Sequence, residues 1–314
     1  KLSEDYLLSE IVAKLLSIRK KNIENIDLFL DPKIKNFLPN PFHLKDMKNA
    51  VERTYYSIIN KQTLGIFGDY DVDGTTGASL LSIGLLSLGA TIDTYIPNRV
   101  KEGYGVSELG IDKAKKFGAD LFITCDCGIN AINCVNYANR KEVDVIITDH
   151  HIPGEALPNA FAILNPKQTD CMYPFKGLCG GGVALKLLMG IVQKLNASFD
   201  LIVDLMDLVS LGTSADLVPM IDENRIIVHY GLQTLRTTLR PGLRELLKVA
   251  NIDLARELTV TQVVFHIAPR INAAGRLGDA NRSVKLLTTT NHSLAKHLAS
   301  ALDKDNKIRQ TIQK

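Results

Sequence analysis

Long apolar runs are missing from this 314-residue sequence. No stretch reaches the roughly 18 consecutive apolar residues that a membrane-spanning helix requires, so the sequence predicts no membrane span. The opening stretch, KLSEDYLLSEIVAKLL, carries acidic residues inside its apolar pattern. That pattern predicts an amphipathic helix and is not typical of a secretory signal.

Cysteine is scarce and charge is nearly balanced. The five cysteines form no C-x-x-C pair and no zinc-finger spacing, which indicates reduced thiols in a cytoplasmic protein. Cys125 and Cys127 flank Asp126, and we interpret them as small buried residues at the end of a strand. The net charge of +3, from 37 basic and 34 acidic residues, is too small to indicate a nucleic-acid partner by itself.

Short apolar runs alternate with longer helical patterns along the chain. Hydrophobic residues make up 46% and charged residues 23%, the balance of a soluble globular protein. The expected strands are 64–67, 91–96, 121–124, 143–148 and 161–164. The expected helices are 75–88, 107–117, 128–140 and 180–194. This alternation predicts an α/β fold in which a parallel sheet carries helices on both faces.

Four regions are expected along the chain. They are an N-terminal helical segment over 1–60, an α/β domain over 61–225, a helical subdomain over 226–292, and the start of a long connecting helix over 293–314. The last helical pattern carries no cap or glycine stop, and we interpret it as leading into a further domain.

The stretch GDYDVDGTTG places three aspartates at alternate positions. Asp69, Asp71 and Asp73, followed by glycine, match the first half of an EF-hand calcium loop. The twelfth position of that loop is Leu80, which cannot bind a cation, so the calcium-loop interpretation fails. A solvated turn is the simpler alternative, although three close carboxylates repel one another unless a cation or basic group lies among them.

Further polar groups follow other apolar segments. They are Asp126 after the third expected strand, Asp149, His150 and His151 after the fourth, and Asp216 at the end of a later apolar segment. Each could be a helix cap or a structural histidine when taken alone. Because the carboxyl ends of parallel strands meet at one edge, we expect these groups to converge, and such a cluster needs cations to be stable. Carboxylates favour magnesium, calcium or manganese, imidazole shifts the choice towards manganese, and this many ligands can hold the two ions used in phosphoryl chemistry.

The stretches GDYDVDG, CDCG, TDHH and LGTSADLVP resemble, in order and spacing, the motifs of the DHH phosphoesterase superfamily. IPNRVKEGYGVS and PRINAAGRLGDANRSVKLL narrow the resemblance to its RecJ-type single-strand-specific exonucleases, from about residue 35 to the end of the chain. The resemblance implies a cytoplasmic, monomeric 5′ to 3′ exonuclease. It would hydrolyse phosphodiester bonds of single-stranded DNA by a two-metal mechanism, in DNA repair and recombination and together with other repair proteins.

The resemblance also implies a role for each matching residue. The implied catalytic residues are Asp71, Asp73, Asp126, Asp149, His150, His151 and Asp216. The implied ligands of two Mn²⁺ or Mg²⁺ ions are Asp69, Asp71, Asp73, Asp126, His150 and Asp216. The implied substrate contacts are His151, Arg99, Tyr104, Arg270, Asn272 and Arg276.

Several of these roles carry alternatives. Asp149 is expected to orient a neighbouring imidazole, as metal-bound histidine usually requires. Arg270 and Arg276 suit bidentate phosphate contacts, with a structural ion pair as the alternative. Tyr104 is expected to stack on a base or to be a buried core residue.

The sequence departs from the family pattern in two places. Phe67 occupies a position where relatives often have a ligand histidine. The C-terminal DHH-associated domain and the oligonucleotide-binding barrel of longer relatives are absent, so we expect weak DNA binding. Two other functions stay open: hydrolysis of oligoribonucleotides, cyclic dinucleotides or pyrophosphate, and a non-catalytic DNA-binding replication scaffold. The nearly complete ligand set argues against the scaffold.

Overall fold

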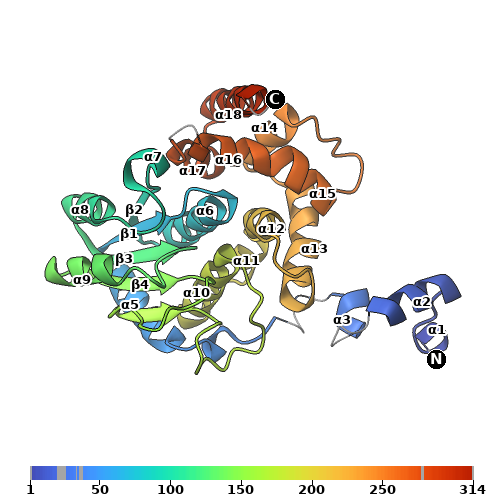
Figure 1. The fold of residues 1–314 in the computed structure, drawn as a ribbon, viewed down its shortest axis with the longest axis horizontal. Coiled ribbons are helices and arrows are strands. Elements are labelled where there is room, and N and C mark those ends of the chain that lie inside the picture. Colours follow the sequence, from blue (N-terminus) through green and yellow to red (C-terminus); the bar gives the residue numbers. More distant parts are fainter. Residues whose placement is uncertain (1, 20–25, 33, 35–37, 277–278, 313–314) are drawn as a thin grey trace.

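Five parallel strands form one sheet, in the order β2-β1-β3-β4-β5 (Figure 1). A computed structural model describes residues 2–19, 26–32, 34, 38–276 and 279–312 of the chain. The strands are β1 (Thr63–Gly68), β2 (Thr91–Tyr95), β3 (Ala119–Cys125), β4 (Asp144–Thr148) and β5 (Ala162–Leu164). All neighbours pair in parallel, so the carboxyl ends of the strands lie along the same edge. The predicted strands and the α/β fold class are confirmed.

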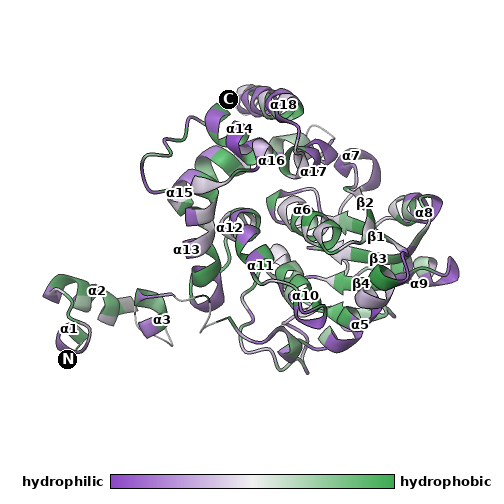
Figure 2. Ribbon diagram, turned by 180° about the vertical axis from the view of Figure 1, so that it is seen from behind, coloured by the Kyte–Doolittle hydropathy of each residue, from purple (hydrophilic) through white to green (hydrophobic). Residues whose placement is uncertain are grey.

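Helices cover both faces of this sheet. One face carries α5 (Met47–Ile59), α6 (Val72–Ser87) and α10 (Gly180–Lys194), and the other carries α8 (Glu108–Lys116) and α9 (Ile132–Arg140). Two buried apolar clusters fill the two interfaces. Figure 2 shows the consequence: the strands, α6 and α10 are mainly hydrophobic, whereas α8 and α9 present polar residues to solvent. Strands buried on both faces explain the continuous apolar runs of the sequence.

The chain after β5 and α10 is helical. Its elements are α11 (Asp200–Asp204), α12 (Met206–Ala215), α13 (Asp222–Thr237), α14 (Pro241–Val249), α15 (Val260–Gln262), a π-helical turn η3 (Val263–Ile267), α16 (Ala268–Arg276), α17 (Asn281–Thr288) and α18 (His292–Ile312). The long helix predicted near the end of the chain is confirmed by α18. Two residues of the PRINAAGRLG motif, 277 and 278, lie outside the described residues.

The N-terminal region holds α1 (Leu2–Asp5), α2 (Glu10–Arg19), α3 (Ile26–Leu30) and the 3₁₀ turn η2 (Pro41–His43), and a short helix α7 (Arg99–Glu102) follows β2. The prediction of one amphipathic helix at the start was wrong, because Leu7 adopts a left-handed backbone conformation, with φ of 52°, that interrupts it. Figures 1 and 2 both show α1 and α2 apart from the sheet. Among the described helices, none combines the length and apolar character needed to cross a membrane.

A buried ion pair joins α10 to α13. Lys186 on α10 and Glu223 at the start of α13 are both inaccessible to solvent, and their charged groups are in direct contact. Glu223 also accepts a hydrogen bond of 2.6 Å from the Tyr173 hydroxyl. Because removing one partner would leave the other charge buried and unpaired, this contact holds the two helices in a fixed relation.

The helix α12 packs so closely against α13 that one contact position has no room for a side chain. A Cβ atom at Gly231 would lie 2.2 Å from Ser210 Cβ and 2.4 Å from the Met206 carbonyl oxygen. The backbone of Met206 cannot move without displacing α12, and α12 ends at Asp216. Glycine at 231 therefore sets the position of a carboxylate that the sequence predicts to be functional.

We predict that Gly231→Ala lowers the free energy of unfolding by about 1–3 kcal/mol, because the added methyl group overpacks this interface. Urea unfolding followed by circular dichroism measures the change. Gln233→Ala, on the exposed side of the same helix, serves as the control and should change the free energy by about 0.5 kcal/mol or less. Equal effects of the two substitutions would contradict the packing argument.

Candidate metal centre

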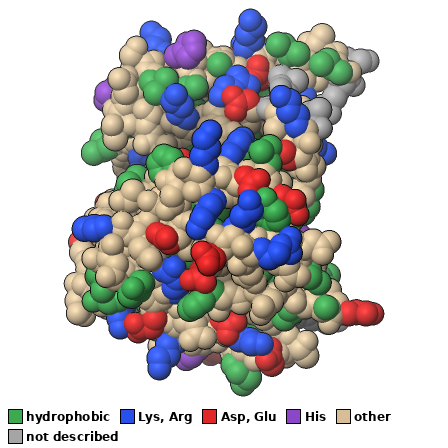
Figure 3. All heavy atoms as spheres, turned by 90° about the vertical axis from the view of Figure 1, so that its left-hand side faces the viewer, with side chains coloured by type: hydrophobic (Ala, Val, Ile, Leu, Met, Phe, Trp, Pro, Cys, Tyr) green, Lys and Arg blue, Asp and Glu red, His purple; other side chains and the backbone are tan. Residues whose placement is uncertain are grey.

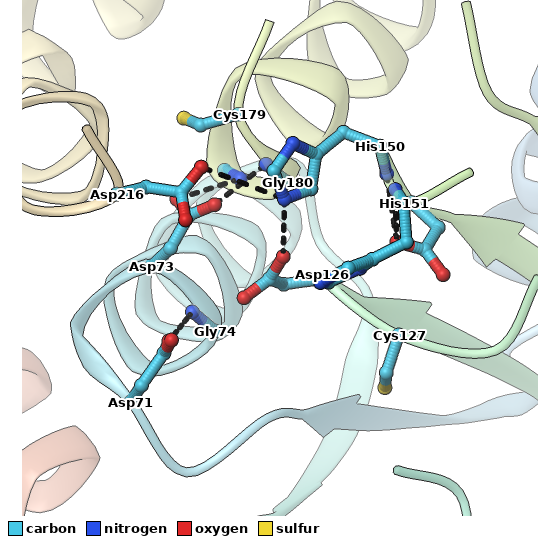
Figure 4. Close-up of polar contacts among 12 residues, drawn as sticks. Asp71, Asp73, Gly74, Asp126, Cys127, His150, His151, Cys179, Gly180 and Asp216 are labelled. Carbon is cyan, nitrogen blue, oxygen red and sulfur yellow. Dashed lines mark hydrogen bonds and ion pairs between the residues drawn. The ribbon is translucent and has the colours of Figure 1, made fainter. Parts of the chain in front are cut away.

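Side chains from four segments meet at the carboxyl edge of the sheet (Figure 4). Asp71 follows β1 and caps α6, where its carboxylate accepts the Gly74 N–H at 3.0 Å. Asp126 follows β3, and His150 follows β4. Asp216 arrives differently: it lies at the C-terminal end of the helix α12. The convergence predicted from the sequence is therefore present, with one contribution coming from a helix end.

The start of α10 holds Asp73 in place. Asp73 is buried in the first turn of α6, and its carboxylate accepts the N–H groups of Gly180 at 2.6 Å and Gly181 at 3.0 Å. Backbone N–H groups at a helix N-terminus carry partial positive charge and stabilise a carboxylate. A Cβ atom at Gly180 would lie 2.5 Å from Asp126 Cβ, so only glycine permits this approach. Sequence reasoning missed these residues, although three consecutive glycines at a helix start were a usable signal.

The backbone of Asp126 is left-handed, with φ of 63°. Among residues with side chains, aspartate and asparagine tolerate this conformation best. It turns the chain sharply after β3 and directs the carboxylate towards His150 (Figure 4). Strained backbone of this kind is common at functional sites.

Several buried polar atoms in this cluster have no hydrogen-bond partner. They are Asp69 Oδ1, Asp126 Oδ1, Asp216 Oδ2 and both ring nitrogens of His150. His150 Nε2 lies 3.2 Å from Asp126 Oδ1 and 3.5 Å from Asp216 Oδ2. Burial lowers the pKa of His150 to about 4, so the ring is neutral at pH 7 and these contacts are not ion pairs. Buried polar atoms left without partners are costly unless a ligand binds them.

The carboxylates of the cluster resist ionising together. Burial, with repulsion from Asp71, raises the pKa of Asp69 to about 7 and that of Asp216 to about 6. Burial and repulsion from Asp216 and Asp71 raise the pKa of Asp73 to about 7. Burial, with repulsion from Asp73, holds the pKa of Asp126 well above its ordinary value. A cation placed among these groups would relieve the repulsion that they share.

The donor atoms fall into two separate triads. Asp73, His150 and Asp216 bring one ligand atom each within 4.8 Å of one another, and so do Asp69, Asp71 and Asp126. A further triad of Asp126, His150 and His151 connects them. Carboxylate oxygens with one imidazole suit manganese or magnesium. The residues present therefore fit two divalent cations, one for each triad.

The His151 ring lies beside that of His150, with 4.6 Å between their centres, and is held by Asp149. The Asp149 carboxylate accepts a hydrogen bond of 2.7 Å from His151 Nδ1, and it also accepts backbone N–H groups, including that of Ile129 at 2.9 Å. Burial works to raise the pKa of Asp149, but these hydrogen bonds outweigh it and lower the pKa. The Asp149 bond raises the pKa of His151. The contact leaves His151 Nε2 facing the Tyr104 hydroxyl at 3.2 Å.

Tyr104 and Arg99 belong to the loop between β2 and α8. Tyr104 has 58% of its surface exposed, so the buried-core alternative for this residue is wrong. The Arg99 guanidinium lies over the Tyr70 ring, 5.0 Å from its centre, and Tyr70 meets Tyr104 edge to face. Both predicted substrate residues thus lie beside the acidic cluster.

Glu102 fixes the conformation of this loop, a role that sequence reasoning missed. Its carboxylate accepts the Tyr95 hydroxyl on β2, the Asn98 N–H at 2.9 Å and the Ser107 hydroxyl at 2.7 Å. Burial works against its ionisation, but these bonds lower the pKa of Glu102. One ionised carboxylate therefore connects both ends of the loop that carries Arg99 and Tyr104. Nothing in the local sequence distinguishes Glu102 from an ordinary surface glutamate.

The three predicted substrate residues of α16 lie in different surroundings. Asn272 and Arg276 line a cavity of about 230 Å³ together with Ala215 and Leu217, the neighbours of Asp216. The Arg270 guanidinium instead pairs with Asp303 on α18 at 2.9 Å. This is the structural ion pair considered as its alternative.

Phe67 supplies no ligand. It is fully buried against the rings of Tyr95 and Phe122, with centroid distances of 5.8 Å and 5.5 Å, in the core beneath α8 and α9. Cys125 and Cys127 are also buried and form no disulfide, so their interpretation as small core residues is confirmed.

Comparison with known proteins shows which family this chain resembles. Residues 63–213 match the family described as the DHH family, N-terminal domain. The chain is 43% identical over 312 residues to the single-stranded-DNA-specific exonuclease RecJ of Bacillus subtilis, across 99% of this chain and 39% of that protein. The chain therefore spans about two fifths of the length of this relative.

Two solved structures share the fold. One, exonuclease RecJ bound to manganese, superimposes with a TM-score of 0.79 at 34% identity, over 87% of this chain and 68% of that one. The other, RecJ from Thermus thermophilus in complex with Mn²⁺, gives a TM-score of 0.83 at 30% identity, over 99% of this chain and 44% of that one.

Repulsion among these aspartates predicts that the free energy of unfolding decreases as the pH rises. The raised pKa values of Asp69, Asp73 and Asp216 mean that the folded protein binds more protons than the unfolded chain between about pH 4 and 7. Their contribution to the free energy of unfolding is therefore present at low pH and is lost as the pH rises through this window. Asp71 raises the pKa of each of these neighbours.

We predict that Asp71→Asn increases the free energy of unfolding by about 1 kcal/mol at pH 8 in EDTA, because it removes a repelling charge while asparagine preserves the helix cap. At pH 5 the gain should shrink, and with saturating Mn²⁺ at pH 8 the wild type should become the more stable protein. Urea unfolding measures all three differences, with Asp204→Asn on the exposed surface as control. A variant that is less stable than the wild type in EDTA at pH 8 would refute the repulsion.

Proposed function

Because this chain belongs to the RecJ family of DHH proteins, we propose that it is a metal-dependent nuclease. It removes nucleotides from the 5′ end of single-stranded DNA, in DNA repair and recombination. The observation that carries this proposal is the set of buried, unpartnered oxygen and nitrogen atoms at the carboxyl edge of the sheet. These atoms face one another at distances that a shared cation could bridge. Metal binding is the function that best explains why they are clustered.

Each triad of donors has a role in holding metal. Asp73, His150 and Asp216 would hold one Mn²⁺ or Mg²⁺ ion, and Asp69, Asp71 and Asp126 the other. Two such ions lower the pKa of a bound water and neutralise charge on phosphoryl oxygens. The protein keeps its ligands in position beforehand: the amides of α10 orient Asp73, and the left-handed backbone orients Asp126. Rigid placement of this kind supplies much of the rate in phosphoryl transfer.

The neutral and cationic residues around the cluster would position the substrate. His151, held by Asp149, presents Nε2 towards the space beside the metal ligands and can contact the scissile phosphate. Arg276 and Asn272 line the cavity next to Asp216 and can bind a neighbouring phosphate. Arg270 has no place in this arrangement, because its guanidinium is engaged by Asp303.

The surface around α7, α8 and α9 supports a polyanionic substrate. Figure 3 shows the side of the molecule where these helices lie, and Lys and Arg side chains lie across its middle with Asp and Glu among them. Exposed basic residues of α7 and α8 are Arg99, Lys101, Lys113, Lys115 and Lys116. A local concentration of positive charge attracts nucleic acid even when the net charge of the chain is small.

Digestion of end-labelled DNA tests the proposal. With Mn²⁺, the wild type should release mononucleotides from 5′-labelled single-stranded DNA at once and release label from the 3′ end only after the strand is consumed. Duplex DNA, dinucleotides and pyrophosphate should turn over far more slowly. Asp216→Asn should reduce cleavage at least about 100-fold, because one cation loses a ligand. Faster turnover of dinucleotides or pyrophosphate, or full activity of Asp216→Asn, would disprove the proposal.

The loop held by Glu102 gives a second prediction. Glu102→Gln replaces one accepting oxygen by an amide donor, so the bonds from Tyr95, Asn98 and Ser107 cannot all form. We expect the KM for single-stranded DNA to rise roughly tenfold and to change more than kcat, because the loop carries binding residues and no metal ligand. Glu108→Gln, on the exposed start of α8, is the control. An equal loss in kcat would show that the loop does not act through binding.

A further inference from the structure

The turn after β5 is a fifth segment at the carboxyl edge of the sheet, and it carries a lysine. β5 pairs in parallel with β4, so its end lies beside the strand end that supplies His150. The backbone shows the same proximity, because the Asp149 N–H donates to the Leu164 carbonyl at 3.0 Å. Asn165 follows Leu164 directly, and Lys167 comes two residues later. The turn therefore brings a positive charge to an edge that gathers carboxylates.

Asn165 fixes this turn relative to the acidic cluster. Its side chain is inaccessible to solvent, Nδ2 donates to the His151 carbonyl at 2.9 Å, and Oδ1 accepts the Lys167 N–H at 2.8 Å. The buried Gln168 side chain donates to the Ile163 carbonyl at 2.9 Å and connects the turn back to β5. One buried amide therefore joins the backbone of Lys167 to the backbone of His151.

The Lys167 side chain is exposed and available for a ligand. Within the part of the chain that the structure describes, its ammonium group makes no hydrogen bond and no ion pair. The Arg270 guanidinium, by contrast, is engaged by Asp303. Because the lysine stem is flexible, the ammonium group can move towards a bound anion without breaking a contact in the protein.

The positive charge of Lys167 acts on two of the predicted metal ligands. Burial has the largest effect on the pKa of His150 and on that of Asp216, and the charge of Lys167 lowers each of these pKa values. Both residues belong to the triad completed by Asp73. Lys167 is therefore close enough to this triad for its charge to influence whatever binds there.

Arg276 and Lys167 reach the cluster from different sides. A Cβ atom at Gly275, which precedes Arg276, would lie 2.7 Å from the carbonyl oxygen of Tyr70, in the turn after β1. Lys167 instead follows β5, and β3 and β4 separate β1 from β5 in the sheet. One phosphate at the cluster therefore has a different cationic side chain on each side.

We propose that Lys167 binds a non-bridging oxygen of the scissile phosphate, beside the triad that contains His150 and Asp216. The inference rests on the proposed function. The position gives Lys167 two opposite effects, because its charge repels a metal ion in the triad and attracts a phosphate at the same place. A residue that only shaped the turn would affect metal and phosphate binding in the same direction.

Calorimetry on the wild type and Lys167→Met tests both effects without requiring turnover. Methionine keeps an unbranched side chain and removes the charge. The Kd for Mn²⁺ should fall about two- to fivefold in Lys167→Met, because a repelling charge is gone. With Mn²⁺ saturating, the Kd for methylphosphonate, a phosphate mimic that cannot be hydrolysed, should rise at least about tenfold.

Two further variants serve as controls. Lys167→Arg retains the charge and should keep both constants within about threefold of the wild type. Lys296→Met removes an exposed lysine from α18, which Figures 1 and 2 both show away from the sheet. It should leave both constants within about twofold, because exposed charges separated by more than about 10 Å are screened by salt.

An unchanged affinity for methylphosphonate in Lys167→Met would overturn the proposal. Weaker binding of Mn²⁺ in that variant would also overturn it, since Lys167 would then support the metal ligands and not the phosphate. Digestion of 5′-labelled single-stranded DNA by the wild type is measured separately. Absence of digestion refutes the proposed function, whereas the two binding constants decide the role of Lys167.

Discussion

Electrostatic repulsion among buried aspartates is the constraint on which the arrangement depends. Asp69, Asp73, Asp126 and Asp216 are gathered where water is largely excluded, and each has a raised pKa. Such a group of carboxylates is unfavourable by itself. The fold keeps it together through contacts that hold individual carboxylates in position. The most direct of these is the pair of amides from α10 that bind Asp73.

Close approaches of the backbone make this gathering possible. Three helices, α6, α10 and α12, meet behind the cluster with glycine at their contact points. A Cβ atom at Gly77 of α6 would lie 2.3 Å from Cys125 Sγ, and one at Gly212 of α12 would lie 2.4 Å from Asp73 Oδ1. Glycine costs helix stability in isolation, but here it brings three helices within reach of one site. The same glycine contacts therefore determine both the geometry of the site and the packing of the core.

Much of this arrangement was predictable from the sequence, because the apolar run of a strand is followed by polar residues where the strand ends. Short apolar runs ended in aspartate or histidine, and parallel strands place such ends along one edge, so the convergence of these side chains followed from pattern alone. The remainder depends on tertiary contacts. Asp216 reaches the cluster from a helix, Glu102 acts through residues that are close only after folding, and Arg270 finds a partner on α18. A local pattern carries no information about contacts of that kind.

Manganese titration with a count of released protons tests the central claim most directly. Because raised pKa values leave protons on the cluster near pH 7, cation binding must displace them. Calorimetry in buffers of different ionisation enthalpy should show two Mn²⁺ ions bound per chain, with at least about one proton released. Binding of two ions with no proton release, or failure to bind manganese, would contradict the account of a repelling carboxylate cluster that cations stabilise.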